Sequence, residues 1–390
     1  MLAAVTPLAT EQVPLADALN TVLAEDLLAT LPSPPFDASA MDGYALAVDS
    51  LTGEGPWRLP VRGESRAGSV LEQLETGTAA RIFTGAAVPR GADAVELQEN
   101  VTLEAGEPAE VVLTSRPRSG QHIRRRGEDL AVGSLALSAG TRLGAFQLGL
   151  CAALDQRTVR VRRRPRLTLI STGDELRAPG SEPWPGSIPE SNSLPLRVVA
   201  EQAGALVEVQ PLARDNETSM TERIRAALPE SDVLVTIGGV SVGDYDVVQP
   251  ALIAAGVEID FWKVGIKPGK PLLFGRAGER FVVGVPGNPV SAQVTFLLFV
   301  VPLLKAMQGD LRARPDFFPA TLAEPLRQKP GRQGFHRARF DDQGRLVPLD
   351  NQSSGAVTSM AHAEALISMP ADSEHLDAGA RVEALRLRSE

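Results

Sequence analysis

The chain has 390 residues, of which 43% are hydrophobic and 22% charged, and this length and composition predict a globular protein of roughly two to four domains. Its net charge is −9 and its sequence pI about 5.2. This acidic balance argues against broad binding to nucleic acids or to anionic membranes and leaves room only for a local basic pocket.

Cysteine and histidine are scarce. Cys151 is the only cysteine, which excludes an internal disulfide, and four histidines make a histidine-rich metal centre a poor expectation. Any metal is therefore expected to be a hard cation held by carboxylates and phosphate oxygens. The first 30 residues carry no lysine or arginine, and the longest apolar run, 296–304, is too short to span a bilayer and contains Pro302. We expect a soluble cytoplasmic protein with no membrane partner.

The first segments of the chain predict a helix and then a small β-rich domain. Leu15, Ala18, Leu19, Val22 and Leu23 recur at helical spacing within residues 1–30, and the prolines from Pro32 onward end this pattern. Residues 31–122 hold many glycines and prolines and short β-type runs at 80–83 and 94–97, which predict a small β-rich domain.

Residues 123–164 begin with a charged loop and continue through a predicted helix at 143–154. Together with residues 1–30 they are expected to form a discontinuous linking domain of helical and extended segments. Residues 309–390 are again β-like, because 335–340 and 345–349 flank a turn signal at 341–344. They are expected to form a C-terminal, β-barrel-like domain.

Strand patterns alternate with helix patterns over residues 165–308. Buried strands are predicted at 167–170, 207–209, 233–237 and 281–285, and helices at about 196–203, 220–228, 247–255 and 289–307. Gly204 is expected to end the first helix, and Asp215 or Asn216 to cap the second. This alternation predicts a doubly wound α/β domain with a parallel sheet.

Three of these strands are followed by unusual loops, namely 171–175, 238–244 and 285–291. In an open parallel sheet such loops meet at one edge, where glycines and a helix N-terminus favour an anion. A set of tight turns is the alternative, and it is weaker for three loops than for one. The candidates for binding phosphate or another oxyanion are Gly238, Gly239, Ser241, Pro286, Asn288 and Pro289, with Asn288 as a cap and Pro289 as the first helical residue.

Acidic residues lie in two of these loops, at Asp174, Glu175, Asp244 and Asp246. Carboxylates beside phosphates need a bridging cation, for which Mg²⁺ is suited. Loop capping explains most single acids, and we expect at least one of Asp174 and Asp244 to be a cap. Glu175 and Asp246 are the predicted metal ligands.

Lys263, Lys267 and Lys270 lie in one loop stiffened by Pro268 and Pro271, which suits a small dianion. Two further motifs are less informative on their own. The run 36–45 contains the turn signal Asp42-Gly43, and the favoured interpretation from its residues is a β-turn. The three arginines and two acids of 124–129 indicate a solvated ion-pair loop more than a site.

In this order along almost the whole chain, the motifs resemble those of the MoeA and gephyrin E-domain family of molybdopterin molybdenumtransferases. The matching segments are 37–45, 84–86, 123–129, 171–176, 238–243, 267–271 and 286–291, with Asp246. The resemblance implies four domains, with a molybdopterin-binding, MogA-like α/β domain over 165–308. It also implies Mg²⁺-dependent insertion of molybdate into adenylated molybdopterin, with release of AMP.

The same resemblance assigns roles to residues. Lys267, Lys270, Pro271 and Ser291 would contact molybdate, joined by Arg337 and Ser354 from the last domain. Lys263 is a candidate for substrate binding from its place in the lysine loop, outside the matching motif. Glu175, Asp215 and Asp246 correspond to the acidic cluster around Mg²⁺ and the phosphates. Asp42, Thr84 and Asp129 correspond to residues that a second subunit of a homodimer brings to the cleft. Contact with the enzyme that adenylates molybdopterin is a further expectation.

Two other functions stay open at this stage. The fold could serve as a non-catalytic scaffold that binds a partner, as a gephyrin-like E domain does, although a scaffold has no need for acids and lysines around one cleft. Residues 165–308 also resemble the domain that adenylates molybdopterin, which would make the chain a molybdopterin adenylyltransferase. The flanking domains favour metal insertion.

Overall fold

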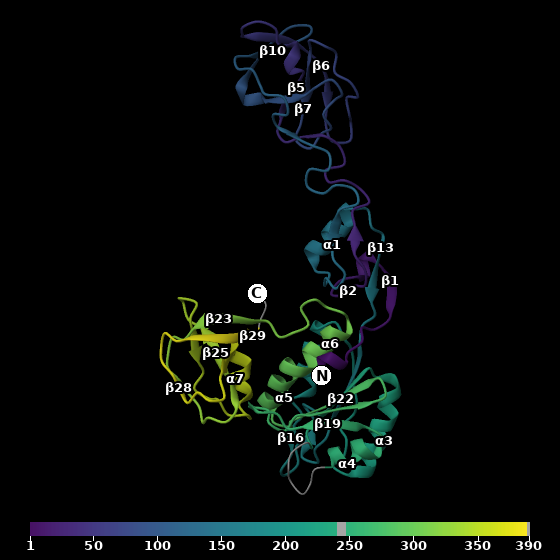
Figure 1. Ribbon diagram of the computed structural model, residues 1–390, viewed down its shortest axis with the longest axis vertical. Helices are drawn as coiled ribbons and strands as arrows, with labels where there is room; N and C mark the ends of the chain where they lie inside the picture. Colours follow the sequence, from purple (N-terminus) through teal and green to yellow (C-terminus); the bar gives the residue numbers. More distant parts are fainter. Residues whose placement is uncertain (240–246, 388–390) are drawn as a thin grey trace.

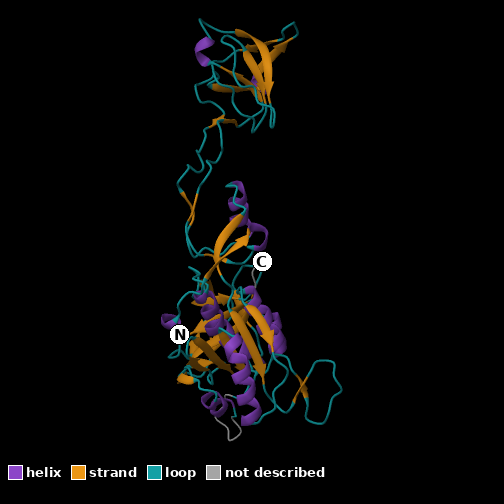
Figure 2. Ribbon diagram, turned by 90° about the vertical axis from the view of Figure 1, so that its right-hand side faces the viewer, coloured by secondary structure: helices purple, strands orange, loops and turns teal. Residues whose placement is uncertain are grey.

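The computed structural model describes residues 1–239 and 247–387, and it is elongated (Figure 1). A small β-rich unit lies at one end and an α/β unit with a C-terminal β unit beside it lies at the other. A linking unit separates them in both views (Figures 1 and 2). The predicted combination of β and α/β units is confirmed. The exact domain boundaries given above stay a prediction.

The small β-rich unit contains one six-stranded sheet in the order β8-β5-β7-β6-β10-β9. Leu46, Leu51, Ala79 and Val111 are almost fully buried in its core. The short β-type runs predicted here are the strands β7 and β8. The strands are β5 (Gly43–Leu46), β6 (Trp57–Ser65), β7 (Ala79–Ile82), β8 (Ala94–Leu97), β9 (Val101–Glu104) and β10 (Glu110–Leu113).

The linking unit combines a three-stranded sheet with the predicted helix α1 (Ala145–Ala153). The sheet has the order β1-β13-β2. Two-stranded ribbons, β3 with β12 and β4 with β11, run from this unit toward the small β-rich unit. The strands are β1 (Thr10–Pro14), β2 (Val22–Leu23), β3 (Leu27–Leu28), β4 (Ala38–Ser39), β11 (Ile123–Arg124), β12 (Leu135–Leu137) and β13 (Thr158–Arg162).

The helix predicted from Leu15 to Leu23 was wrong. Only a 3₁₀ turn forms at Leu15–Asp17, and Val22 and Leu23 belong to strand β2. Asn20 has a φ of 63°, a left-handed conformation that ends any helix, and Leu19 is 56% exposed. The apolar spacing was helical by coincidence, because pairing with β13 determines the backbone here.

The α/β unit has a six-stranded sheet in the order β17-β14-β18-β22-β21-β19. The predicted strands β17, β14, β18 and β22 are parallel, but β21 and β19 are antiparallel to their neighbours, so the sheet is mixed rather than wholly parallel. This edge was missed because the sequence analysis predicted no strand over residues 258–262 or 273–277. The strands are β14 (Arg166–Ser171), β17 (Leu206–Val209), β18 (Val233–Ile237), β19 (Glu258–Trp262), β21 (Leu273–Ala277) and β22 (Arg280–Val285).

Helices cover both faces of this sheet, as Figure 2 shows, which is the doubly wound arrangement predicted. One hydrophobic core lies under α2 and α5–α6, and the other lies under α3 and α4. The helices are α2 (Ser193–Gln202), α3 (Glu217–Ala227), α4 (Val248–Ala254), α5 (Pro289–Thr295) and α6 (Val301–Met307).

A π-helical turn, Phe296–Val300, joins α5 to α6, so that the helix continues past Pro302. This 19-residue stretch, Pro289–Met307, is long and apolar enough to cross a membrane, but 61% of it is buried inside the protein, as expected for a core helix.

The C-terminal β unit is a sheet in the order β20-β25-β27-β29-β23, with β26 pairing to β25 across the predicted turn. Its first strand, β20 (Ile266–Lys267), comes from the lysine loop and pairs with β25, so this loop ties the two units together. The other elements are β23 (Phe317–Thr321), β24 (Leu326–Arg327), β25 (Gln333–Phe340), β26 (Leu346–Pro348), α7 (Val357–His362), β27 (Ala365–Met369), β28 (His375–Leu376) and β29 (Arg381–Arg386).

Candidate functional site

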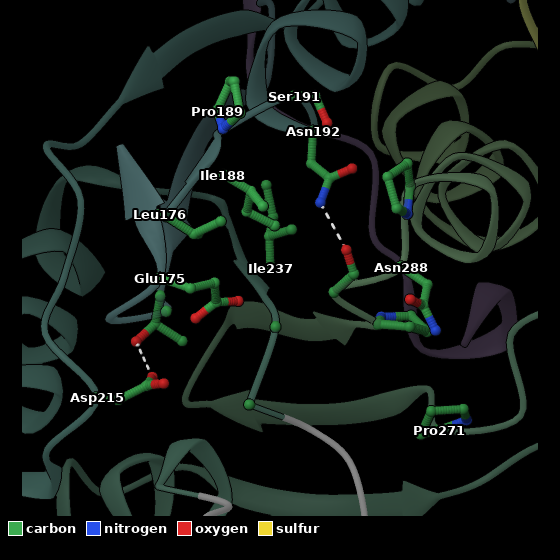
Figure 3. A pocket seen from close by; sticks show the side chains of 17 residues that line it. Glu175, Leu176, Ile188, Pro189, Ser191, Asn192, Asp215, Ile237, Pro271 and Asn288 are labelled. Carbon is green, nitrogen blue, oxygen red and sulfur yellow. Dashed lines mark hydrogen bonds between the residues drawn. The ribbon is translucent and has the colours of Figure 1, made fainter. Parts of the chain in front are cut away.

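A cavity of about 390 Å³ lies beyond the carboxyl ends of β14, β18 and β22 (Figure 3). All three predicted loops contribute to its wall, as expected for strands that end at the same edge of a sheet. The lining residues are Thr172, Gly173, Glu175, Leu176, Ile188, Pro189, Ser191, Asn192, Asp215, Ile237, Gly238, Gly239, Pro271, Pro286, Gly287, Asn288 and Pro289.

Glycine is required where the second loop leaves β18. Gly238 and Gly239 have φ values of 90° and 61°, a region in which side chains are strained. A Cβ on Gly238 would also lie 2.8 Å from the carbonyl oxygen of Thr172, and one on Gly239 would lie 2.5 Å from Val248. The backbone of this loop can therefore approach both a neighbouring loop and a ligand closely. Ser241, Asp244 and Asp246 follow in the sequence and lie outside the described residues.

Two carboxylates reach the cavity from different loops. Figure 3 shows Glu175 and Asp215 on the same side of it. The Thr172 hydroxyl donates to Asp215 Oδ1 at 2.6 Å, and the Asp215 N–H donates to Asp174 Oδ1 at 3.2 Å. Asp174 thus acts as the loop cap that was predicted for at least one of the acids. Helix α3 begins directly after this contact, with Asn216 as its N-cap.

Another part of the wall contains residues that sequence reasoning did not single out. Strands β15 (Leu176–Arg177) and β16 (Ile188–Pro189) pair with each other, and residues 178–187 between them form an arm. Leu176 and Ile188, at the base of this arm, line the cavity. Asn192 Nδ2 donates to the carbonyl oxygen of Gly287 at 2.8 Å and so joins this wall to the third loop. The run Ser191-Asn192-Ser193 before a helix pattern was the available signal, because these residues favour helix starts.

Buried Glu190 holds the start of helix α2. Its Oε1 accepts from the N–H groups of Asn192 and Ser193 at 2.8 and 2.9 Å. By contrast, Asn288 occupies the N-cap position of α5 but makes no side-chain capping bond, and Pro289 is the first helical residue as predicted. The Asn288 side chain is exposed at the cavity.

The lysine loop lies between the cavity and the C-terminal β unit. Pro271 lines the cavity, whereas the described lining includes neither Lys267 nor Lys270, both of which are exposed. Lys267 instead pairs in register with Gly334 of β25. The prediction that Lys267 and Lys270 share one pocket with Glu175 and Asp246 stays a prediction, and Asp246 lies outside the described residues.

Arg337 on β25 is fully buried and, among the residues that the structure describes, bonds only to neutral acceptors. Its Nε donates to Ser359 Oγ at 2.9 Å, and one Nη donates to the carbonyl oxygens of Asn351 and Ser353. Its other Nη has no partner in the described chain. Burial lowers the pKa of Arg337 from its ordinary value. A buried guanidinium without a carboxylate is costly, which favours an external anion.

The surroundings of Arg337 connect it to helix α5. The N–H of Val290 donates to the carbonyl oxygen of Ser354 at 3.1 Å, next to buried Ser291. His336, which the sequence analysis missed, bonds to Gln328 Oε1 through Nε2 at 3.1 Å. Burial first, and then the nearby charges of Lys267 and Arg337, lower the pKa of His336 to about 4, so that it is neutral at pH 7.

Asp42 and Thr84 meet in the small β-rich unit. Asp42 Oδ1 accepts from the Thr84 N–H at 2.7 Å and from its hydroxyl at 2.8 Å, and the backbone bond holds the pKa of Asp42 below its usual range. Gly43 starts β5 against the carbonyl oxygen of Glu96, where a Cβ would clash. The structure therefore brings two of the predicted residues together.

Asp129 lies between strands β11 and β12 of the two ribbons, beside Ser33, Pro34 and Arg124. Its N–H donates to the carbonyl oxygen of Ser33 at 3.0 Å. Asp37 ties this region to the motif that contains Asp42, because its carboxylate accepts from Arg125 and from the Arg126 N–H, both at 2.7 Å. Within one chain these elements lie far from the α/β cavity (Figure 1).

Comparison with known proteins agrees with this geometry. Three family models match successive parts of the chain: the MoeA N-terminal region (domain I and II) over 1–154, the "Probable molybdopterin binding domain" over 168–306, and the MoeA C-terminal region (domain IV) over 319–387. A molybdopterin molybdenumtransferase from Haemophilus influenzae is 37% identical over 344 residues, covering 87% of this chain and 84% of that protein. The chain belongs to the MoeA family.

Other MoeA relatives extend the match. A molybdopterin molybdenumtransferase from Synechococcus elongatus is 38% identical and covers 98% of this chain and 95% of its own length. The crystal structure of a molybdopterin biosynthesis MoeA protein from Pyrococcus horikoshii OT3 superimposes with a TM-score of 0.85 at 29% identity, covering 99% of this chain and 97% of that one. The resemblance inferred from the motifs is confirmed, and the chain is a member of a transferase family.

Proposed function

We propose that this protein inserts molybdate into adenylated molybdopterin and releases AMP. The observation that carries this proposal is the continuity of two binding regions. Pro271 lines the cavity with Glu175 and Asp215, and the lysine loop that ends at Pro271 pairs through β20 with the strand holding buried Arg337. One region suits a phosphoanhydride with its cation, and the other suits a small oxyanion.

In the proposed complex, the phosphates lie against Gly238, Gly239 and the start of α5 at Asn288 and Pro289. Backbone N–H groups at a glycine-rich turn and at a helix N-terminus favour negative charge. Pro286 shapes this wall. Cleavage of a phosphoanhydride depends mainly on positioning and charge neutralisation, so a histidine or cysteine nucleophile is not required.

Mg²⁺ fits the donor set. It commonly binds through one or two carboxylates, with waters and substrate phosphates completing its shell. Glu175 and Asp215 supply two carboxylates in the described chain, where no group of three or more metal-binding side chains occurs, and Asp246 is the proposed third. When bound, Mg²⁺ would neutralise phosphate charge. The Thr172 hydroxyl and Asp174 keep Asp215 directed at this region.

The proposed molybdate site lies at the junction of the α/β and C-terminal units. Its candidates are Lys263, Lys267, Lys270, Pro271, Ser291, Arg337 and Ser354. Support comes from the β20–β25 pairing, the Val290–Ser354 bond and the unpartnered Nη of Arg337. A guanidinium held by its own acceptors presents a fixed donor, whereas exposed lysines adjust to the anion.

A homodimer would complete the site. Asp42, Thr84 and Asp129 are too far from the cavity of their own chain to serve it, so a second copy would have to supply them. The outer face of α2 supports self-association, because Leu194 and Val198, one turn apart, are 67% and 43% exposed. A cytoplasmic location, contact with the adenylating enzyme and the four domain boundaries stated above belong to the same proposal.

The direct test is AMP release by purified protein given adenylated molybdopterin, Mg²⁺ and molybdate. We expect molybdate-dependent AMP release, and we expect Glu175→Gln to abolish it while the circular dichroism spectrum is unchanged. Glu182→Gln, an exposed acid on the arm beyond β15, is the matched control and should keep full activity. Folded wild-type protein that releases no AMP would refute the proposed function, and unchanged turnover in Glu175→Gln would remove Glu175 from the site.

A further inference from the structure

Lys263 has an unusual backbone conformation at the end of strand β19. Successive side chains of a strand point to opposite faces, so Lys263 should point away from its neighbour Trp262. Its φ of 78° lies in the left-handed region, and this turns the side chain back to the same side. The ammonium Nζ consequently lies 4.0 Å from the centroid of the Trp262 ring, within cation–π distance.

The surrounding backbone fixes this strained residue against the segment 270–272. The Lys263 N–H donates to the carbonyl oxygen of Leu272 at 2.8 Å, and the Val264 N–H donates to that of Lys270 at 2.9 Å. These bonds hold Lys263 against the segment that contains Pro271, which lines the cavity. A non-glycine residue in such a conformation persists only where neighbouring structure imposes it, and such residues gather at functional sites.

We propose that Trp262 is a positioning residue that holds the Lys263 ammonium ready for the oxyanion substrate; this inference rests on the proposed function. In the proposed function the lysine loop binds an anion next to the carboxylates Glu175 and Asp215, and a flexible ammonium there would tend to pair with them. The face of an indole ring attracts a cation through its quadrupole and carries no net charge. Trp262 can therefore restrain Lys263 and leave its charge available to an anion.

The first test is the contact itself, without any ligand. The chain has only five lysines, so selective labelling of lysine with carbon-13 gives a simple NMR spectrum in which Lys263→Met identifies the signal of Lys263. We expect the ring current of Trp262 to shift the Lys263 side-chain methylene signals upfield in the wild type. The shift should vanish in Trp262→Leu and persist in part in Trp262→Phe. An unshifted Lys263 signal in the wild type would overturn the inference.

The second test is a double-mutant cycle on molybdate binding, measured by calorimetry. A contact of this kind at an exposed site predicts that Trp262→Leu raises the Kd for molybdate about two- to fivefold, whereas Trp262→Phe restores most of the affinity. In the Lys263→Met background, Trp262→Leu should have no further effect, because the ring acts through the lysine. Trp184→Phe, on the exposed arm, is the control and should bind as the wild type does.

The outcomes separate the two proposals. An equal loss of affinity from Trp262→Leu in both backgrounds means that the ring only packs, which overturns the positioning role and leaves the proposed function intact. Wild-type protein that neither binds molybdate nor releases AMP overturns both. A change of turnover number without a change of molybdate Kd or KM would also contradict positioning.

Discussion

The burial of Arg337 predicts that a small oxyanion stabilises the folded protein. This guanidinium has no exposed surface, and one Nη has no partner within residues 1–239 and 247–387. It has therefore lost hydration that its three neutral acceptors only partly replace. A dianion bound against it would supply the missing charge-assisted bonds. We expect molybdate to raise the unfolding temperature in a saturable manner, with no Mg²⁺ or pterin present.

The size of the effect follows from mass action. A ligand at 100 times its Kd stabilises the folded state by about 2.7 kcal/mol. The α/β and C-terminal units share the β20–β25 pairing, so we expect them to unfold together. For a unit of about 200 residues, each kcal/mol shifts the transition by roughly 2–4 °C, which predicts an increase of about 5–10 °C.

The assay is differential scanning calorimetry across a molybdate titration, with sulfate as a second tetrahedral dianion. Arg337→Met should lose the increase, whereas Arg339→Met, two residues along the same strand and exposed, should keep it. The reasoning is refuted if Arg337→Met and the wild type respond equally, because the stabilising anion would then bind elsewhere.

Three further changes should have separable effects. Lys267→Ala should raise the KM for molybdate about tenfold or more without altering the fold, since removing one charge from a shared anion site costs on the order of 2 kcal/mol, and exposed Lys329→Ala is its control. His336 has a folded pKa of about 4 against 6.5 in the unfolded chain. Neutral His336 therefore contributes fully to the free energy of unfolding above pH 6.5, and this contribution, at most about 3 kcal/mol, is lost as the pH falls toward 4. Urea unfolding at several pH values should show this loss, and His336→Gln should reduce the dependence of stability on pH. Gly43→Ala should unfold the small β-rich unit, because the new Cβ would clash with the backbone of β8, whereas Gly149→Ala in helix α1 meets nothing and should raise the unfolding temperature slightly.

The parts of the fold that were predicted correctly depend on local sequence. Buried strands such as 233–237 can be predicted from continuous apolar residues, and helices such as α2 from periodic ones. That the loops after the strands meet at one edge follows from the topology of parallel sheets. The helix expected over Leu15–Leu23 failed because β13, more than 130 residues later in the chain, pairs with that segment. Apolar spacing carries no information about such a distant partner.

The candidate site shows the same division. The cavity glycines Gly238 and Gly239 and the acid Glu175 were identifiable because each follows a recognisable strand, whereas Asp215 was assigned to the site only by the resemblance. Arg337 and Ser354 were expected only from the resemblance, and the burial of Arg337 depends on acceptors at 351, 353 and 359 that no local pattern reveals. His336 was missed because its role comes from a contact with Gln328, which lies outside strand β25. Asn192 was missed because its role comes from a contact with Gly287, which is distant in sequence and belongs to the third loop.

The distribution of cations indicates why the proposed anion site would be built across two units. Three of the five lysines in the chain lie between 263 and 270, whereas the buried cation of the C-terminal unit is an arginine. A guanidinium fork can be fixed by several acceptors at once, whereas an ammonium on a flexible stem adapts to the position of an anion. The fixed donor, Arg337, lies on β25, and the adaptable donors, the lysines, lie on the loop that includes β20. An anion bound by both kinds of donor would therefore also bridge the two units. Binding of oxyanion and docking of the C-terminal unit should therefore be thermodynamically linked, so that each strengthens the other.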